Sequence, residues 1–446
     1  MRLKVEGLFG HFDYDLPLFE NDGQIAILTG PNGFGKTTIL RCMEALSKGD
    51  LSFFSEIKFQ SLIFTADDAR CLKIRRDGDR LIFAAGKITS AGEEFSAENG
   101  FTVREIEDFQ KAAVHKINIF KNSGESTARK RLGDKLPAMV EIGQVMREII
   151  GEVRLIPFLR LLAKEEDDDN DYDDDNYDDD DDDDDGDDND DDDLVEPLKK
   201  IPGKIRQEIA RATREYNKVS IELDSQFPLR LLSMKDGDAF TEEEFTQQYK
   251  MMGDKLNKLR EIGISPATGL PDNLYYNLQD ARALRILLDN FNQKYQAYAP
   301  LLEKLSLFRK VINDRFLFKS VEISEQQRLI VVDEKAEAAG SKRESLIPLE
   351  NLSSGEKETL LMFYELIFEM GAENGRKDTL LLIDEPETSL HVLWQSYFIR
   401  DLEKIVKRSG FRAIIATHSP SFVNGHRSVQ IDLGELYRIW QEQKKR

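Results

Sequence analysis

Cysteine is scarce in this sequence, with only Cys42 and Cys71 among 446 residues. Their spacing matches neither a zinc site nor a disulfide framework, so we expect both to be packing residues in a reducing compartment. Long apolar runs are also missing. Residues 155–163 are interrupted by Arg160, whereas a membrane span needs about 20 apolar positions. The chain opens in strand-like residues rather than a signal peptide, so we expect a cytoplasmic protein without membrane contact.

Basic residues are absent from residues 165–193, which contain 23 acidic residues. The net charge of the whole chain is −22, so the remainder sums to +1 and does not exclude a nucleic acid partner. Because like charges repel and this segment cannot bury apolar area, we expect residues 164–194 to be disordered. Three interpretations stay open: a solvated linker, a DNA-mimicking tail over a basic groove, or a docking surface for a basic partner.

Strand and helix patterns alternate at both ends of the chain. Near the start, the patterns predict one helix over residues 36–46 and strands over residues 2–7, 24–29, 57–64, 71–75 and 80–84. The Asp77-Gly78 pair favours a tight hairpin between the last two strands. Residues 105–151 are mainly helical in pattern. Later the patterns predict helices over 355–370 and 390–408, and strands over 318–323, 328–333, 379–383 and 412–417.

The middle of the chain is helical in pattern. Apolar residues recur at spacings of three and four in three stripes, over residues 205–223, 245–259 and 284–305. Each stripe supports about 20 to 30 residues, so helical arms would reach about 30 to 45 Å. We expect a packed helical subdomain rather than an exposed coiled coil.

Residues 30–37 match G-x-x-x-x-G-K-[ST], the pattern of a phosphate-binding loop, between an apolar strand and a helix. Its glycines let backbone N–H groups converge on phosphates. Lys36 would place a positive charge on the β and γ oxygens, and Thr37 would offer its hydroxyl to Mg²⁺. The expected ATP contacts of this loop are Gly30, Pro31, Asn32, Gly33, Phe34, Gly35, Lys36, Thr37 and Thr38.

A second apolar strand ends in the adjacent carboxylates Asp384 and Glu385, which is the Walker B pattern. In that pattern the first carboxylate holds Mg²⁺ and the second polarises the attacking water as a general base. We therefore expect Thr37 and Asp384 as metal ligands, and Lys36 and Glu385 as catalytic residues. ATP and Mg²⁺ are the expected ligands.

Two further motifs complete a family pattern. Leu352-Ser353-Ser354-Gly355-Glu356 stands before a helix, and Ala416-Thr417-His418-Ser419-Pro420 follows a strand. With the phosphate loop and residues 384–391, they resemble an ABC-type ATPase head of the RecF, SMC and OLD-like lineage. The resemblance covers about the first 65 and last 130 residues. It is closest to stand-alone anti-phage defence ATPases such as PtuA and AriA, which share segments similar to residues 312–316.

This resemblance implies roles for further residues. The signature residues Ser353, Ser354 and Gly355 would contact the γ-phosphate held by a second subunit, since a helix N-terminus favours phosphate. His418 would be the switch histidine that senses this phosphate, and residues 387–391 would form the D-loop. The resemblance therefore implies a homo-oligomer, at least a head-to-tail dimer with two ATP molecules between the heads.

One part of the family pattern has no clear counterpart. Related ATPases place a glutamine, the Q-loop residue, in a segment similar to residues 153–160, where this chain has Leu159. Gln60 and Gln144 are alternatives without a supporting motif.

The expected fold is α/β: a P-loop ATPase head with a mixed sheet and an antiparallel β subdomain. A helical insertion and the acidic tract interrupt it. The expected domains are an N-terminal ATPase lobe at residues 1–163, the tract at 164–194, the helical insertion at 195–310, and a C-terminal lobe at 311–446.

The resemblance implies an ATP-gated sensor or regulatory subunit of a prokaryotic anti-phage defence system, triggered by nucleic acid or a phage protein. Because the chain runs only 28 residues past His418 and shows no nuclease metal cluster, the effector, expected to be a nuclease, would be a separate protein. The alternative is a DNA repair or recombination ATPase of RecF or SMC type. A transporter subunit fits poorly, since more than 300 residues separate the phosphate loop from the signature. Hydrolysis can be fast or serve as a slow switch.

Overall fold

The structure is a computed structural model, and it describes residues 1–19, 23–89, 92–95, 98–110, 135–157, 195–234, 240–264, 275–324, 328–338, 345–370, 379–388, 390 and 392–444. The chain divides into two compact units. The first unit contains Met1–Arg160 and Met370–Arg446, and the second contains Leu161–Glu369. The expected disordered tract lies outside the described residues. The units also divide the chain differently from the expected domains, because residues 311–369 group with the helical insertion.

A parallel sheet in the first unit joins strands from both ends of the chain. Its order is β15 (Gln430–Asp432), β3 (Ile25–Thr29), β14 (Arg412–Thr417), β13 (Leu380–Asp384) and β9 (Val153–Pro157). In register, Asp384 lies opposite Ala416, and Ala416 lies opposite Leu28. The carboxyl ends of β3, β14 and β13 therefore meet at one edge of the sheet, where ligands bind in open parallel sheets.

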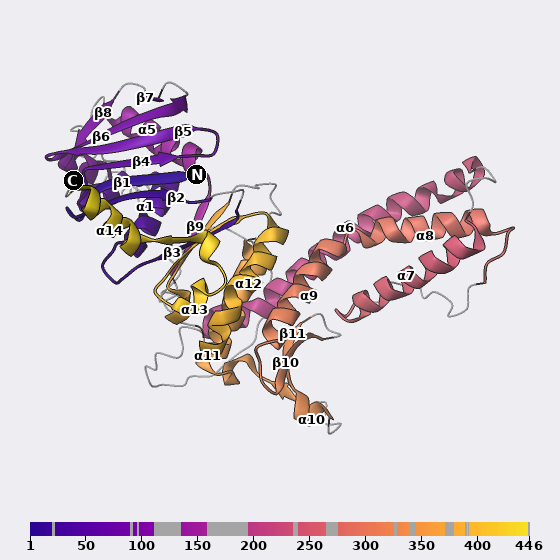
Figure 1. The fold of residues 1–446 in the computed structure, drawn as a ribbon. Helices are drawn as coiled ribbons and strands as arrows, with labels where there is room; N and C mark the ends of the chain where they lie inside the picture. Colours follow the sequence, from indigo (N-terminus) through magenta and orange to yellow (C-terminus); the bar gives the residue numbers. More distant parts are fainter. Residues whose placement is uncertain are drawn as a thin grey trace, which may run out of the picture. The chain divides into compact units, whose positions relative to one another are not determined.

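An antiparallel sheet forms the other layer of strands in this unit (Figure 1). Its hairpin was expected: β5 (Arg70–Asp77) and β6 (Arg80–Thr89) pair with Asp77 opposite Arg80, and Gly78 in the turn has a φ of 60°. The sheet runs in the order β2 (Phe12–Pro17), β1 (Arg2–Leu8), β4 (Ser61–Thr65), β5 (Arg70–Asp77), β6 (Arg80–Thr89) and β7 (Gly92–Phe95), and β8 (Asn99–Thr102) also pairs with β6.

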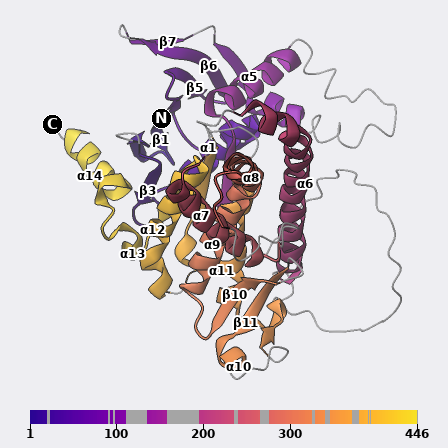
Figure 2. The ribbon, with the colours of Figure 1, turned by 90° about the vertical axis from the view of Figure 1, so that its right-hand side faces the viewer.

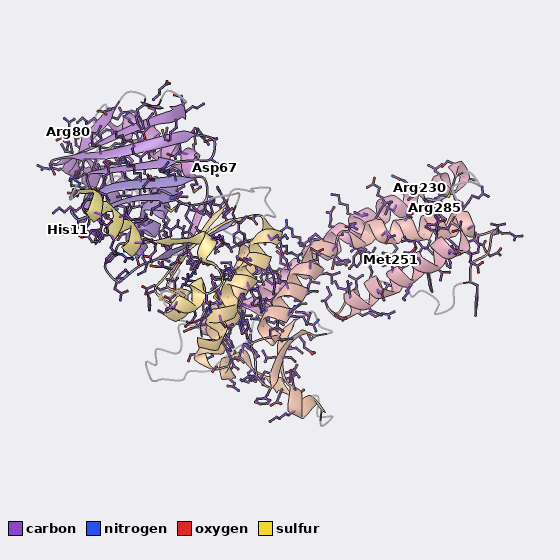
Figure 3. All side chains as sticks on the ribbon, viewed as in Figure 1. His11, Asp67, Arg80, Arg230, Met251 and Arg285 are labelled. Atoms are coloured by element: carbon purple, nitrogen blue, oxygen red, sulfur yellow. The ribbon has the colours of Figure 1, made fainter. Side chains whose placement is uncertain are left out.

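One hydrophobic core connects the two sheets. Leu3 of β1, Leu382 of β13 and Ile414 of β14 belong to the same buried cluster as Ile39 and Met43 of α1 (Lys36–Lys48). Arg412, at the start of β14, also forms an ion pair with Asp67, with 2.6 Å between its guanidinium nitrogen and the carboxylate oxygen. Figure 3 labels Asp67. The helix that follows the phosphate loop is thus held by residues of both sheets. Other helices among the described residues of this unit are α2 (Leu51–Glu56), α5 (Lys135–Ile150), α12 (Val392–Ser409), α13 (Pro420–Val423) and α14 (Leu433–Lys444).

The α/β fold with an antiparallel subdomain and a helical insertion is confirmed. The other expected strands and helices at both chain ends are present with shifts of a few residues at most boundaries, and strand 57–64 begins only at Ser61. Of the helical segment expected at residues 105–151, residues 111–134 lie outside the described residues. The sequence patterns missed β2, α2, β7, β8, β15 and α14, most of which are short. Cys42 and Cys71 are buried, as expected.

Where the structure describes it, the second unit contains four long helices, a small sheet and the helix that follows the signature motif. The helices are α6 (Val195–Ser233), α7 (Glu242–Arg260), α8 (Ala281–Tyr295) and α9 (Ala299–Asn313). Antiparallel β10 (Lys319–Ile323), β11 (Leu329–Asp333) and β12 (Leu346–Ile347) form the sheet, with α10 (Glu334–Ala338) after β11. A 3-10 turn η4 (Leu349–Asn351) precedes α11 (Ser354–Tyr364), which continues as a π-helical turn η5 (Glu365–Glu369).

Two expectations for these helices were wrong. The third stripe is not one helix, since the chain turns at residues 296–298 between α8 and α9. Helix α6 has 39 residues and spans about 58 Å, more than the expected reach. α8 contacts both α6 and α7 (Figures 1 and 2). Leu229 and Leu232 near the end of α6 are nevertheless 71% and 84% exposed. These three helices therefore form an arm rather than a fully packed subdomain.

Polar contacts hold the far part of the arm together. Figure 3 labels Arg230 on α6, Met251 on α7 and Arg285 on α8. Arg230 donates a hydrogen bond to Asn290 of α8. The guanidinium of Arg285 lies 4.9 Å from the ring centroid of Phe240. Such cation–π contacts add to the stability that the buried apolar residues of α7 and α8 supply.

Candidate ATP site

Glycines shape the phosphate loop between β3 and α1. Gly30, Gly33 and Gly35 have φ angles of 151°, 82° and 87°. A Cβ at Gly35 would also lie only 2.9 Å from Leu8 Cδ2, so both the backbone angle and the space favour glycine there. Within the described residues no side chain caps the start of α1. Its first backbone N–H groups are thus available to a phosphate.

The lysine of the loop is held inside it. Lys36 is 5% exposed, and its Nζ donates a hydrogen bond to the Gly30 carbonyl oxygen at 3.0 Å. A carbonyl oxygen is a weaker partner for an ammonium group than a charged phosphate oxygen. The contact shows that the lysine side chain already folds back over its own loop.

Aromatic residues from two other elements fix the tip of the loop. The Tyr14 hydroxyl of β2 donates to the Phe34 carbonyl oxygen at 2.9 Å. The Phe34 ring lies 5.1 Å from the Phe12 ring and 5.8 Å from the Tyr437 ring of α14. The sequence patterns missed both β2 and α14, although the aromatic spacing Phe12-x-Tyr14 was a signal of a strand.

The Walker B carboxylate lies beside the loop threonine. The Thr37 hydroxyl lies close enough to Asp384 to favour its ionised form, and Lys36, Arg41 and Glu385 are also close enough to influence the Asp384 charge. Burial raises the pKa of Asp384 above its ordinary value, and the charge of Glu385 adds to this, while Thr37, Lys36 and Arg41 oppose it. Asp384 Oδ1 is buried without a hydrogen-bond partner among the described residues.

This arrangement fits Mg²⁺. A buried, unpaired carboxylate oxygen beside a threonine hydroxyl supplies the hard oxygen ligands that the ion prefers, and its positive charge would offset the unfavourable burial of Asp384. The two residues expected as metal ligands from the sequence are therefore neighbours in the structure.

Glu385 adopts a strained backbone conformation. Its φ is 51°, in the left-handed region that a residue with a side chain rarely occupies. Its N–H donates to the Ala416 carbonyl oxygen at 2.8 Å, and Thr388 Oγ1 donates to the Glu385 carbonyl oxygen at 2.8 Å. These contacts hold the strain, which often marks a functional position.

His418 lies between two carboxylates at the end of β14. Its Nδ1 is 3.8 Å from Glu385 Oε1 and 3.0 Å from Glu387 Oε1. Glu387 belongs to a 3-10 turn, η6 (Pro386–Thr388), and is buried. Gln395 of α12 is also buried and bonds the Glu387 and Leu390 carbonyl oxygens. The sequence patterns placed Glu387 only within the D-loop and missed Gln395.

A cavity of about 1080 Å³ opens at the same sheet edge. Gly30 and Pro31 of the phosphate loop line it, together with His418, Asn424, Arg427 and Asp432. The phosphate loop and His418 therefore face one open space, which is large enough for a ligand of drug size.

The signature motif lies in the second unit. Ser353 is the N-cap of α11, and its hydroxyl accepts a hydrogen bond from the Glu356 N–H. Lys319 of β10 forms an ion pair with Glu356 at 2.8 Å. Burial would raise the pKa of the Glu356 carboxyl, but the bonds from Lys319 and the Ser353 N–H outweigh it and lower the pKa. The helix start is therefore fixed, with Ser353 and Ser354 exposed.

A family model described as the AAA ATPase domain matches residues 3–423, nearly the whole chain. The chain belongs to the AAA ATPase domain family. It is thus an ATPase with a nucleotide-binding site, and Mg²⁺ is the metal typical of such sites.

Other comparisons add little to the family match. A search of curated proteins finds no relative of this AAA ATPase. The SMC head domain from Thermotoga maritima is similar over 95% of this chain and 90% of that chain, at 10% identity and a TM-score of 0.31. The SmcHead bound to the C-winged helix domain of ScpA gives the same coverage and identity and a TM-score of 0.32. Both scores are too low to inform function.

Some expected features of this ATPase stay untested. Gln144 lies on α5 and bonds Glu148, Gln60 pairs with Glu6 through its backbone, and Leu159 lies outside the described residues, so the Q-loop stays unassigned. Of the D-loop, residues 389 and 391 also lie outside them. Within the described ranges no group of three or more His, Cys, Asp or Glu forms a metal site. In those same ranges no helix is both long and apolar enough to cross a membrane.

Proposed function

We propose that this chain hydrolyses ATP at the edge where β3, β14 and β13 end. The proximity of Thr37 to Asp384, whose Oδ1 is buried and has no hydrogen-bond partner among the described residues, is the observation that supports this most strongly. Thr37 and Asp384 hold Mg²⁺, which when bound draws negative charge away from the phosphate oxygens. Lys36 exchanges its bond to the Gly30 carbonyl for a phosphate oxygen, because a charged acceptor is the stronger partner.

In this proposal Glu385 is the general base and His418 contacts the γ-phosphate. Hydrogen bonds to the Ala416 carbonyl and from the Thr388 hydroxyl hold the strained Glu385 backbone. The backbone therefore helps to fix where the Glu385 carboxylate lies. General bases contribute about 10²- to 10⁴-fold to rate. The His418 side chain is 49% exposed, which leaves it accessible to a ligand.

The signature motif completes the site of a second subunit in this proposal. Ser353, Ser354 and Gly355 stand at the exposed N-terminus of α11, where unpaired N–H groups and the helix dipole favour phosphate. The active form would be a head-to-tail dimer with two ATP molecules between the subunits.

Two variants test the ATPase proposal. Lys36→Ala should lose nucleotide binding, measured by titration with a fluorescent ATP analogue. Glu385→Gln should bind ATP, hydrolyse it at least 100-fold more slowly, and accumulate as a dimer in light scattering. Glu403→Gln, an exposed carboxylate of α12, is the matched control and should behave like the wild type. Hydrolysis by Glu385→Gln at the wild-type rate would refute the base assignment.

For the biological role we propose a sensor subunit of a prokaryotic anti-phage defence system that controls a separate nuclease. The motif resemblance supports it. The test is phage infection of cells that express this chain with its neighbouring genes. Protection that is lost in Lys36→Ala, together with a co-purified nuclease, is the expected result. Intrinsic nuclease activity abolished by a mutation within this chain would contradict it.

The arm favours a second candidate, a DNA repair or recombination ATPase of RecF or SMC type. Helix α6 is longer than the sequence stripes predicted and carries exposed Lys200, Lys204 and Lys218. Filter binding with duplex DNA distinguishes the two roles. ATP-dependent, salt-sensitive affinity without any protein partner would favour the second candidate.

A further inference from the structure

Glu387, which the sequence patterns placed only within the expected D-loop, has an unusual concentration of contacts. Its side chain is 5% exposed. Its Oε1 accepts a hydrogen bond from Thr417 Oγ1 at 2.7 Å and one from the His418 backbone N–H at 2.8 Å. The same oxygen lies 3.0 Å from His418 Nδ1. One carboxylate oxygen therefore contacts both the backbone and the ring of the switch histidine.

These contacts decide which ring nitrogen carries the proton. An ionised carboxylate offers no proton, so a nitrogen at 3.0 Å is stable only if it donates. His418 Nδ1 must then carry a hydrogen, which leaves Nε2 for another partner. A neutral ring would accept at Nε2, while a protonated ring could donate there to a phosphate oxygen. In either state Glu387 sets the ring orientation.

The support extends to neighbouring residues. Gln395 is 8% exposed, bonds the Glu387 carbonyl oxygen at 3.1 Å, and accepts from Ser419 Oγ at 3.0 Å. The turn that carries Glu387 and the segment that carries His418 are thus tied to the same side chain of α12. Because the His418 ring is half exposed, packing alone does not fix its orientation.

Glu387 also competes with the proposed base for the histidine. Glu385 Oε1 is 3.8 Å from the same Nδ1, 0.8 Å farther than Glu387 Oε1. Without the Glu387 carboxylate, Nδ1 could donate to Glu385 instead. Such a pair would engage the oxygen that should polarise water.

We propose that Glu387 is a positioning residue that keeps His418 protonated on Nδ1, directs Nε2 to the ligand, and leaves Glu385 available as base. This inference rests on the proposed function, in which His418 contacts the γ-phosphate. The role resembles that of a carboxylate behind a catalytic histidine, where loss of the correct ring tautomer lowers kcat strongly.

The experiment uses the full chain with Glu387→Gln, which preserves shape but removes the charge. We expect kcat to fall about 10- to 100-fold, which is typical when a residue that orients a ligand-contacting side chain is lost. The KM for ATP should stay within about threefold of the wild-type value. Nitrogen-15 NMR of the histidine ring should show Nδ1-protonated His418 in the wild type and a mixed population in the variant. The His418 signal is assigned by its loss in His418→Ala.

Glu403→Gln is a matched control, because Glu403 lies 3.2 Å from His426 Nδ1 in the same kind of pair away from the proposed base. It should leave kcat and the His418 signals unchanged. The double variant Glu387→Gln/His418→Ala should be no slower than His418→Ala, because both changes act through one ring.

The outcomes separate this inference from the proposed function. If His418→Ala retains the wild-type kcat, the proposed role of His418 fails. If His418→Ala is slow but Glu387→Gln is not, the positioning role is overturned while the ATPase proposal stands. Should Glu387→Gln fail to fold, the wild-type spectrum still decides, since a neutral ring protonated on Nε2 contradicts the inference.

Discussion

The two signature serines should separate into a structural and a ligand-binding residue. Ser353 is the N-cap of α11, whereas Ser354 is its first residue and makes no cap bond in this helix. Ser353→Ala should therefore loosen the helix start. Ser354→Ala should leave it intact and weaken the proposed ATP-dependent dimer.

The expected loss of stability at the start of α11 in Ser353→Ala follows from the geometry of its capping box. Losing an N-cap serine costs about 0.5–2 kcal/mol. Here Ser353 Oγ accepts from the Glu356 N–H over a long 3.4 Å, while the 2.9 Å bond from the Ser353 N–H to Glu356 Oε2 survives in alanine. The cost should thus lie near the lower end, about 0.5–1 kcal/mol. That corresponds to about a two- to fivefold larger opening equilibrium for the first turn.

Hydrogen exchange of the α11 amides measures this opening directly, which avoids assuming two-state unfolding of a chain with two units. Ser353→Thr is the control, since threonine keeps the cap acceptor. Exchange should rise in Ser353→Ala and stay unchanged in Ser353→Thr and Ser354→Ala. Equal acceleration in both alanine variants would refute the division of roles.

Three other changes test the ATP site. Burial raises the pKa of Asp384 in the folded apo protein. The apo protein should therefore lose stability as the pH rises from the ordinary carboxyl pKa through this raised pKa, because the folded state must then hold the buried negative charge. Asp384→Asn should therefore raise the apo melting temperature at neutral pH and abolish Mg²⁺-dependent stabilisation by ATP, in thermal melts with and without EDTA. Tyr14→Phe removes the bond to the Phe34 carbonyl, worth about 1 kcal/mol, and should weaken ATP binding several-fold in titration. Gly35→Ala should cost more than about 1 kcal/mol in urea unfolding, because of its φ of 87° and the Leu8 contact.

Much of the ATP site was predictable from local sequence. A phosphate loop needs glycines at fixed offsets, a lysine and a threonine, so residues 30–37 predict one without any tertiary information. Buried parallel strands are continuous apolar runs, which made β3, β13 and β14 visible. The hairpin of β5 and β6 was evident because a two-residue turn restricts the residues that can occupy it.

Other features could not be read from the chain alone. The third apolar stripe continues through residues 284–305, so periodicity did not show the turn between α8 and α9. Helix α6 continues to Ser233, beyond Leu223, the last buried residue of its apolar stripe. The apolar residues of this extension, Leu229 and Leu232, are exposed, so the periodicity did not predict it.

The sequence by itself identified the phosphate-loop pattern of residues 30–37 and a carboxylate pair after an apolar strand. Only the tertiary structure brought Thr37 beside Asp384 and placed Glu387 against His418, which is 31 residues away. A motif can be recognised from the sequence when the residues that carry its chemistry are close together in the chain. The contact of Glu387 depends on how β13 and β14 align in the sheet, and strand register is a property of the folded chain.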